Sequence, residues 1–230
     1  MRKTALILAL ASTVASLGVF VCATAQQGDI LLLKDKKYSI YTNPLEPFLE
    51  KNPGKLPKSD VTSTSNWRGY VATWQVKSDR FVLVDVGILH AITRPGQSGF
   101  STELLSVMSK VFPGQTEVLA EWFTGNVIIP DGKLVSYVHM GYASTYEKYI
   151  ILRVEKGIVT RVSAVDNTGF VRFRDAQFAA YKKTEEYRKA LAESVAEGSK
   201  EGSMSVQQNE EFLREFYSER YMSLIFDDQQ

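Results

Sequence analysis

The sequence has very few of the side chains on which most metal sites and nucleophilic active sites depend. It contains one cysteine, Cys22, and two histidines, His90 and His139, which lie far apart in the sequence. Neither histidine has a second ligand at the spacing of a zinc-binding motif, and no phosphate-binding loop or Gly-x-Gly-x-x-Gly sequence occurs. We therefore expect no metal ion and no cofactor.

An excess of charge of either sign is also missing. The chain has 27 lysines and arginines against 26 aspartates and glutamates. Such a balance creates no electrostatic field that would attract nucleic acid or an anionic membrane surface. We expect no nucleic-acid partner.

Residues 1–25 have the pattern of a cleavable signal peptide. Arg2 and Lys3 precede residues 4–22, which carry no charged side chain, and Ala23-Thr24-Ala25 supplies the small-x-small pattern that signal peptidase recognises. Cleavage after Ala25 would leave Gln26 as the first residue. The pattern predicts a periplasmic or secreted protein with no integral membrane span after cleavage.

Two alternatives remain for this segment. An uncleaved membrane anchor needs about 20 apolar residues, whereas polar residues interrupt the stretch between Ser12 and Gly18. Lipidation at Cys22 is the other alternative, but the bulky Val21 stands where lipoprotein sites carry a small residue. After cleavage the chain would contain no cysteine, so its stability must come from a hydrophobic core and not from disulfides.

The pattern of residues 30–165 predicts a succession of short strands. Apolar segments at 30–33 and 38–42 flank a charged turn, and residues 67–76 and 81–88 form a second predicted hairpin. We expect a short helix at 102–111, and Asp131-Gly132 predicts a further hairpin turn. The expected order is that of an antiparallel meander.

Residues 173–226 change to a helical pattern. A lysine- and glutamate-rich helix is expected at 175–196, and Ser205 with Gln208 predicts a capping box for a final helix ending near Phe226. The fold class is therefore α+β, with a twisted antiparallel sheet of seven to nine strands, one short inserted helix and two C-terminal helices. We expect residues 26–230 to form one domain.

The densest cluster of polar and aromatic residues lies at 137–147. On a strand Tyr137 and His139 share a face, and the following turn would bring Tyr146 and Glu147 back towards them. A histidine held by a carboxylate could act as a general acid or base, which makes His139, Glu147 and Tyr137 candidate catalytic residues. The same cluster could instead fix the loop, or could present Tyr142, Tyr146 and His139 to a ligand. No nucleophile or oxyanion donor is evident.

Glu46 and Arg68 complete the candidate binding residues. Asn43-Pro44 predicts a turn, after which Glu46 could contact a ligand or a partner. Arg68 lies in a predicted central strand, where a buried guanidinium needs a carboxylate. Asp85 or Glu121 could supply it, and we favour a structural ion pair over an anion site.

Three segments resemble recurring blocks of a family of exported bacterial proteins of unknown function. They are Tyr41-Thr42-Asn43-Pro44-Leu45-Glu46, Asn66-Trp67-Arg68-Gly69-Tyr70 and Tyr137-Val138-His139-Met140-Gly141-Tyr142. The resemblance spans about residues 38–157. It implies export, but no activity, cofactor or site.

The sparse catalytic residue types and the aromatic content of 11% favour a non-enzymatic binding module. We expect it to recognise a ligand or another protein of the envelope, as an immunity factor or inhibitor would. One alternative is a hydrolase-like enzyme centred on His139 and Glu147. Another is an envelope structural protein that self-associates through its C-terminal helix, and the oligomeric state stays open.

Overall fold

The computed structural model of the chain describes residues 25–94, 96, 98–201 and 204–226. The predicted signal peptide therefore lies outside the described residues, apart from Ala25. Among the helices of the described ranges, none combines the length and the apolar character that a membrane crossing requires.

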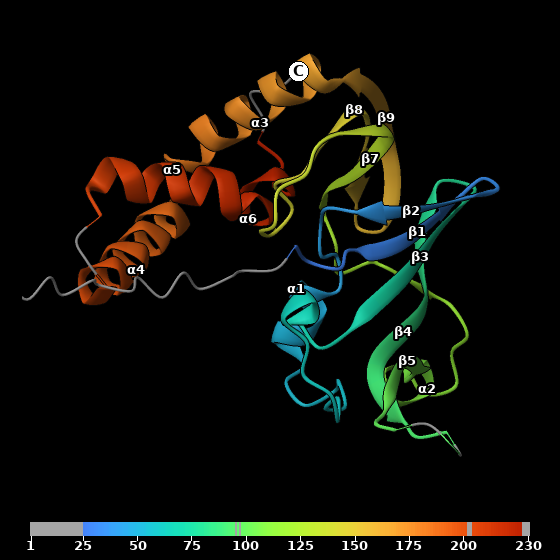
Figure 1. Cartoon of the computed structure of the whole chain (residues 1–230). Helices are drawn as coiled ribbons and strands as arrows, with labels where there is room; N and C mark the ends of the chain where they lie inside the picture. The colour runs from blue at the N-terminus through green and yellow to red at the C-terminus, as the bar shows by residue number, and fades with distance from the viewer. Residues whose placement is uncertain (1–24, 95, 97, 202–203, 227–230) are drawn as a thin grey trace, which may run out of the picture.

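A mixed β-sheet dominates the fold, and it contains nine strands within the described residues (Figure 1). Its strands follow the order β2-β1-β3-β4-β9-β8-β7, and β5 and β6 also pair with β4. The strands are β1 (Asp29–Leu33), β2 (Lys36–Ile40), β3 (Val71–Lys77), β4 (Arg80–Ile92), β5 (Ser101–Ser106), β6 (Val118–Leu119), β7 (Gly125–Ser136), β8 (Thr145–Glu155) and β9 (Ile158–Asp166). The sheet-dominated α+β class is confirmed.

The predicted meander needs one correction, because β1 and β3 are parallel neighbours. The hairpin of β1 and β2 is antiparallel as expected, and so is the hairpin of β3 and β4. Between the two hairpins the chain makes a long crossover through α1 (Glu46–Lys51) and the short 3-10 helix η1 (Thr64–Asn66). Such a crossover is what a parallel pairing requires.

The helices that follow the sheet lie together on one side of it (Figure 1). In the described part of the C-terminal region there are four, where the sequence predicted two: α3 (Asn167–Tyr181), α4 (Glu185–Glu201), α5 (Val206–Phe216) and α6 (Ser218–Met222). Thr184 divides the first predicted helix, because its hydroxyl accepts a hydrogen bond from the N–H of Tyr187 and so caps α4. The capping box of Ser205 and Gln208 at the start of α5 is confirmed.

Two local predictions were wrong. Residues 101–106 form β5 and not a helix, and only α2 (Met108–Val111) is helical there. The long strand β4 offers an edge that β5 pairs with from Gly87 to Ile92, and this pairing overrides the helical spacing of the apolar residues. Asp131-Gly132 makes no hairpin turn, because β7 continues through it along β8 with a shift of register, which is the geometry of a β-bulge.

The hydrophobic core of the described residues forms two clusters. The first lies around β3 and β4, where Trp74 stacks on Phe81 with ring centroids 4.7 Å apart. The second joins β7 and β8 to the helices, and Tyr149 there stacks on Phe170. Tyr221 is fully buried in this second cluster, where its ring packs against Phe178 and Tyr181 of α3, so α6 is covered by α3, which itself lies on β8 and β9.

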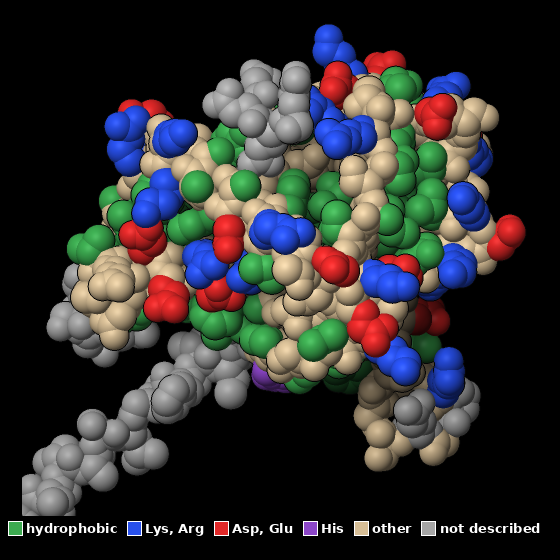
Figure 2. Space-filling view, turned by 90° about the horizontal axis from the view of Figure 1, so that it is seen from above, with side chains coloured by type: hydrophobic (Ala, Val, Ile, Leu, Met, Phe, Trp, Pro, Cys, Tyr) green, Lys and Arg blue, Asp and Glu red, His purple; other side chains and the backbone are tan. Residues whose placement is uncertain are grey.

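The surface shows no region of a single charge on the face drawn in Figure 2, where lysines and arginines alternate with aspartates and glutamates. This distribution agrees with the balanced composition of the chain. It gives that face no field for the long-range attraction of a highly charged partner.

Candidate functional site

A cleft opens where the two end strands of the sheet meet. The N–H of Tyr41, the residue after β2, donates a hydrogen bond to the carbonyl oxygen of Ile128 in β7 at 2.8 Å. Two residues further along β7, Pro130 occupies the same edge and has no N–H to donate. β2 and β7 are not paired as neighbouring strands, and a cleft of about 540 Å³ lies beside this point. Its volume is within the range of small-ligand sites.

Tyrosines contribute much of the lining of this cleft. Among the described residues they are Tyr38, Tyr41, Tyr137 and Tyr146. Tyr41 is buried and Tyr38 and Tyr146 are half-buried, whereas Tyr137 is 59% exposed. The cleft therefore has aromatic walls, with the buried ring of Tyr41 at its base and the exposed ring of Tyr137 at its rim. We call it the tyrosine cleft.

The charged residues of the tyrosine cleft lie on opposite walls. Lys37 comes from β2 and Asp131 from β7, and Ser39 and Ser144 add hydroxyl groups. The two charges are of opposite sign. The cleft therefore favours a ligand without a large net charge.

The structure brings Tyr137 and Tyr146 to the same cleft but separates the predicted catalytic pair. The hydroxyl of Tyr137 lies 2.8 Å from Nδ1 of His139, and both side chains are exposed. Glu147 instead accepts a hydrogen bond from the N–H of Lys133 in β7. Within the described ranges no hydrogen bond or ion pair joins Glu147 to His139. The expected orientation of His139 by a carboxylate is therefore not found.

Tyr142, a predicted ligand contact, lies behind the cleft and not in it. It is buried, its ring stacks on that of Tyr41 with centroids 5.0 Å apart, and its hydroxyl donates to Oδ1 of Asn43 at 2.9 Å. Burial raises the pKa of both tyrosines above the ordinary value, so both hydroxyls stay protonated. Tyr142 therefore supports the base of the cleft.

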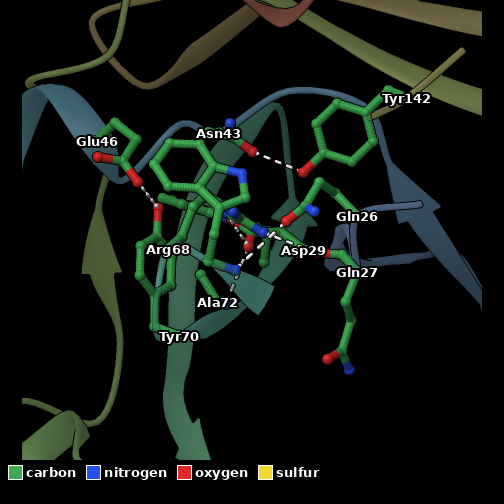
Figure 3. A network of polar contacts seen from close by, with 11 residues as sticks. Gln26, Gln27, Asp29, Asn43, Glu46, Arg68, Tyr70, Ala72 and Tyr142 are labelled. Carbon is green, nitrogen blue, oxygen red and sulfur yellow. Dashed lines mark hydrogen bonds and ion pairs between the residues drawn. The ribbon is translucent and has the colours of Figure 1, made fainter. Parts of the chain in front are cut away.

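Arg68 forms a buried ion pair, but with a different carboxylate from the two that the sequence suggested (Figure 3). Its Nη1 donates to Oδ1 of Asp29 at 2.9 Å, and the exposed fractions of the two side chains are 1% and 0%. Asp85 instead accepts from the hydroxyl of Ser106. Arg68 also lies before β3 and not within a strand, in the turn that ends at Gly69 with a φ of 78°. The predicted structural ion pair is confirmed and its predicted partners were wrong.

Asp29 also organises the start of β3. Its Oδ1 accepts a hydrogen bond from the N–H of Ala72 at 3.1 Å, and its Oδ2 accepts one from Nε1 of Trp74 at 3.0 Å. Burial alone would lower the pKa of Arg68, but the negative charge of Asp29, together with smaller effects of nearby tyrosines and of the hydrogen bond to Asp29, raises that pKa overall. The group is a structural centre that holds β1 against β3.

Glu46 is linked to the same centre and is not free for a ligand. Its Oε1 accepts a hydrogen bond from the hydroxyl of the buried Tyr70 at 3.0 Å, and the guanidinium of Arg68 lies 4.7 Å from the centre of the Tyr70 ring (Figure 3). Burial raises the pKa of the Glu46 carboxyl, although the hydrogen bond from Tyr70 acts against that rise.

The first described residues form part of the cleft wall, which the sequence alone did not indicate. Ala25 and Gln26 line the cleft, and the N–H of Gln26 donates to the carbonyl oxygen of Gly141 at 3.0 Å. The N–H of Gln27 donates to the carbonyl oxygen of Ser65 at 2.7 Å, and the carbonyl oxygen of Gln27 accepts from Nη2 of Arg68. The ion pair thus fixes the strand-like segment that borders the tyrosine cleft.

Comparison of the chain with family models, with curated proteins and with solved structures gave no match. The resemblance to a family of exported bacterial proteins therefore stays a prediction. In the part of the chain that the structure describes, no group of three or more histidine, cysteine, aspartate or glutamate side chains is placed to hold a metal ion. The function must be argued from the tyrosine cleft itself.

Proposed function

We propose that the protein is an exported, non-enzymatic binding module of the bacterial envelope or the secreted fraction, and that its ligand occupies the tyrosine cleft. The observation that carries this proposal is the cleft between β2 and β7, where aromatic rings and strand edges converge. Tyrosine suits such a role because it offers a large, rigid contact area and a polar hydroxyl at a low cost in side-chain entropy.

The base of the cleft is pre-organised for binding. Tyr41 is packed between Tyr142 and Tyr146, with ring centroids 5.0 Å and 6.1 Å away. The adjoining N-terminal segment is tied to the Asp29–Arg68 ion pair through Gln27. A ligand would therefore meet walls that need little ordering, which reduces the entropic cost of association.

A hydrolase centred on His139 and Glu147 is the second candidate. The hydrogen-bond distance between Tyr137 and His139 favours it, since it places two proton-transfer groups in contact. The bonding of Glu147 to the backbone of Lys133 counts against it, because the histidine then lacks its orienting carboxylate. Self-association through the C-terminal helices has less support, because Leu213 and Tyr221 of that region are buried within the chain.

A thermal-unfolding screen tests the leading proposal. The mature chain would be heated with short peptides and with peptidoglycan fragments, alongside the variants Ser39→Trp and Ala164→Trp. Both substituted positions are exposed on strands, but only Ser39 lines the cleft. A ligand present at a hundred times its Kd should raise the free energy of unfolding by about 2.7 kcal/mol.

We expect this stabilisation in the wild type and in Ala164→Trp, but not in Ser39→Trp. Equal stabilisation of all three proteins would show that the ligand binds elsewhere. His139→Ala should keep the ligand-induced stabilisation. Hydrolysis of a ligand that disappears in His139→Ala, with folding intact, would replace the binding proposal by the enzymatic one.

A further inference from the structure

We infer that the ligand of the tyrosine cleft is an extended polypeptide segment, which pairs as a strand with the edge of β2 that faces β7. This inference rests on the proposed function and specifies the chemistry of its ligand. It follows from the direction of the backbone groups on the two walls of the cleft.

On the β2 wall, the backbone faces the cleft. The N–H of Tyr41 points to β7, since it donates to Ile128. Backbone groups of a strand point to the same edge at every second residue, so those of Ser39 and Lys37 point to the same side. Both residues line the cleft. This wall therefore offers an edge with which an incoming strand can pair.

On the β7 wall, the edge carries two features that weaken strand pairing. The carbonyl of Ile128 accepts from β2, but Pro130 on the same edge has only an acceptor. The register of β7 against β8 then shifts between Asp131 and Leu134, and a bulge of this kind bends a strand. The proline leaves this edge with one donor fewer and the bulge bends it, so β7 is a poorer pairing partner for β2 than a regular strand would be.

One extended segment is already held in this way at the end of the cleft. The N–H of Gln26, the first residue after the predicted cleavage site, donates to the carbonyl oxygen of Gly141 at 3.0 Å. Backbone pairing is therefore the mode by which the neighbouring wall binds a chain in extended conformation. A peptide in the cleft would repeat that mode beside β2.

The dimensions and the side chains of the cleft fit a short strand. Beyond the hydrogen bond of Tyr41, the edge from Ser39 to Lys37 covers two residue steps, or about 7 Å at the rise of a β-strand. Strand addition takes its affinity from main-chain hydrogen bonds and its specificity from pockets for alternate side chains. Tyr38, Tyr137 and Tyr146 would border those alternate side chains, which favours apolar or aromatic residues at every second position.

A phage-displayed library of linear decapeptides provides the probe. It would be selected on the immobilised mature chain, with removal of phage that bind Ser39→Trp, and Ala164→Trp would serve as the matched control. We expect enrichment of peptides with apolar or aromatic residues at alternate positions, which bind the wild type and Ala164→Trp alike. Failure of any peptide to enrich over the Ser39→Trp background would overturn the inference.

Backbone N-methylation then tests the binding mode without any change to the protein. Each residue of the best peptide would be N-methylated in turn, which removes one N–H donor. Strand addition predicts a loss of affinity of about fivefold or more at alternate residues and a much smaller loss at those between them, since one backbone hydrogen bond contributes about 1 kcal/mol. A scan without this two-residue period would refute strand pairing even for a peptide that binds.

Pro130→Thr tests the reason for the gap. A threonine supplies the missing N–H and is favourable in strands, so β2 and β7 should pair further and close the cleft. We expect the affinity for the selected peptide to fall at least tenfold while the thermal midpoint does not decrease. Unchanged affinity would overturn the assignment of Pro130 as the residue that keeps the cleft open.

The outcomes also separate the inference from the proposed function. Stabilisation by peptidoglycan fragments that is lost in Ser39→Trp, with no peptide selected, would retain a binding module and reject a peptide ligand. The absence of any ligand that distinguishes Ser39→Trp from Ala164→Trp would reject both.

Discussion

Replacement of Asp29 by alanine should be the most destabilising single change in the centre beside the cleft. The carboxylate is fully buried and accepts hydrogen bonds from Arg68, from the N–H of Ala72 and from Nε1 of Trp74. Asp29→Ala would leave the guanidinium of Arg68 charged in a site where its side chain is 1% exposed. Removal of one partner from a buried ion pair costs about 3–5 kcal/mol. That is a large part of the 5–15 kcal/mol by which domains are typically stable.

Urea unfolding followed by far-ultraviolet circular dichroism measures this loss. With an m-value of about 2 kcal/mol/M, the midpoint should fall by about 2 M. Asp85→Ala is the control, because Asp85 is a carboxylate of the same sheet that accepts from Ser106 outside the buried centre. Its urea midpoint should change much less than that of Asp29→Ala, since few surface substitutions change the free energy of unfolding by more than about 0.5 kcal/mol.

A double substitution distinguishes the ion pair from packing. Arg68→Met removes the charge and keeps much of the side-chain volume, so Asp29→Ala with Arg68→Met leaves no unpaired charge in the core. The double variant should therefore be more stable than the sum of the two single losses predicts. A loss below about 1 kcal/mol in Asp29→Ala, or strict additivity in the double variant, would refute the reasoning.

Three further predictions concern other parts of the fold. Burial raises the pKa of Glu219 from 4.5 to about 7, and its Oε2 has no hydrogen-bond partner among the described residues. The folded protein therefore holds this proton more tightly than the unfolded chain does. The free energy of unfolding should fall as the pH rises from about 4.5 to 7. Glu219→Gln should remove that fall and be more stable than the wild type at pH 8, by up to about 3 kcal/mol in urea titrations; parallel pH profiles would contradict it. Ser205→Ala should lower the free energy of unfolding by about 1 kcal/mol, because it removes the hydroxyl that accepts from the N–H of Gln208 and caps α5. An unchanged thermal midpoint in calorimetry would contradict this role of the cap. Tyr142→Phe should lower stability by about 1 kcal/mol through loss of its bond to Asn43, yet leave ligand affinity unchanged in calorimetric titration; weaker binding would place this hydroxyl in the site.

The sequence alone predicted the features that depend on neighbouring residues. The hairpin of β1 and β2, the hairpin of β3 and β4 and the capping box of Ser205 all have local signatures, and the structure contains each of them. The α+β class follows from the same periodicities. The need of Arg68 for a buried carboxylate was also predictable, because it follows from the cost of burying a charge.

Only the tertiary structure decided which distant segments meet. Residues 101–106 became a strand because β4 offers them an edge, although their spacing suits a helix. Arg68 pairs with Asp29 and not with Asp85, since the parallel placement of β1 beside β3 brings the two together. The tyrosine cleft lies where Tyr41, the residue after β2, bonds to Ile128 of β7, and Pro130 follows on the same edge without an N–H to donate. A pattern of apolar and polar residues specifies the face and the period of an element, but strand partners depend on contacts between segments that are remote in the chain, and no local pattern records them.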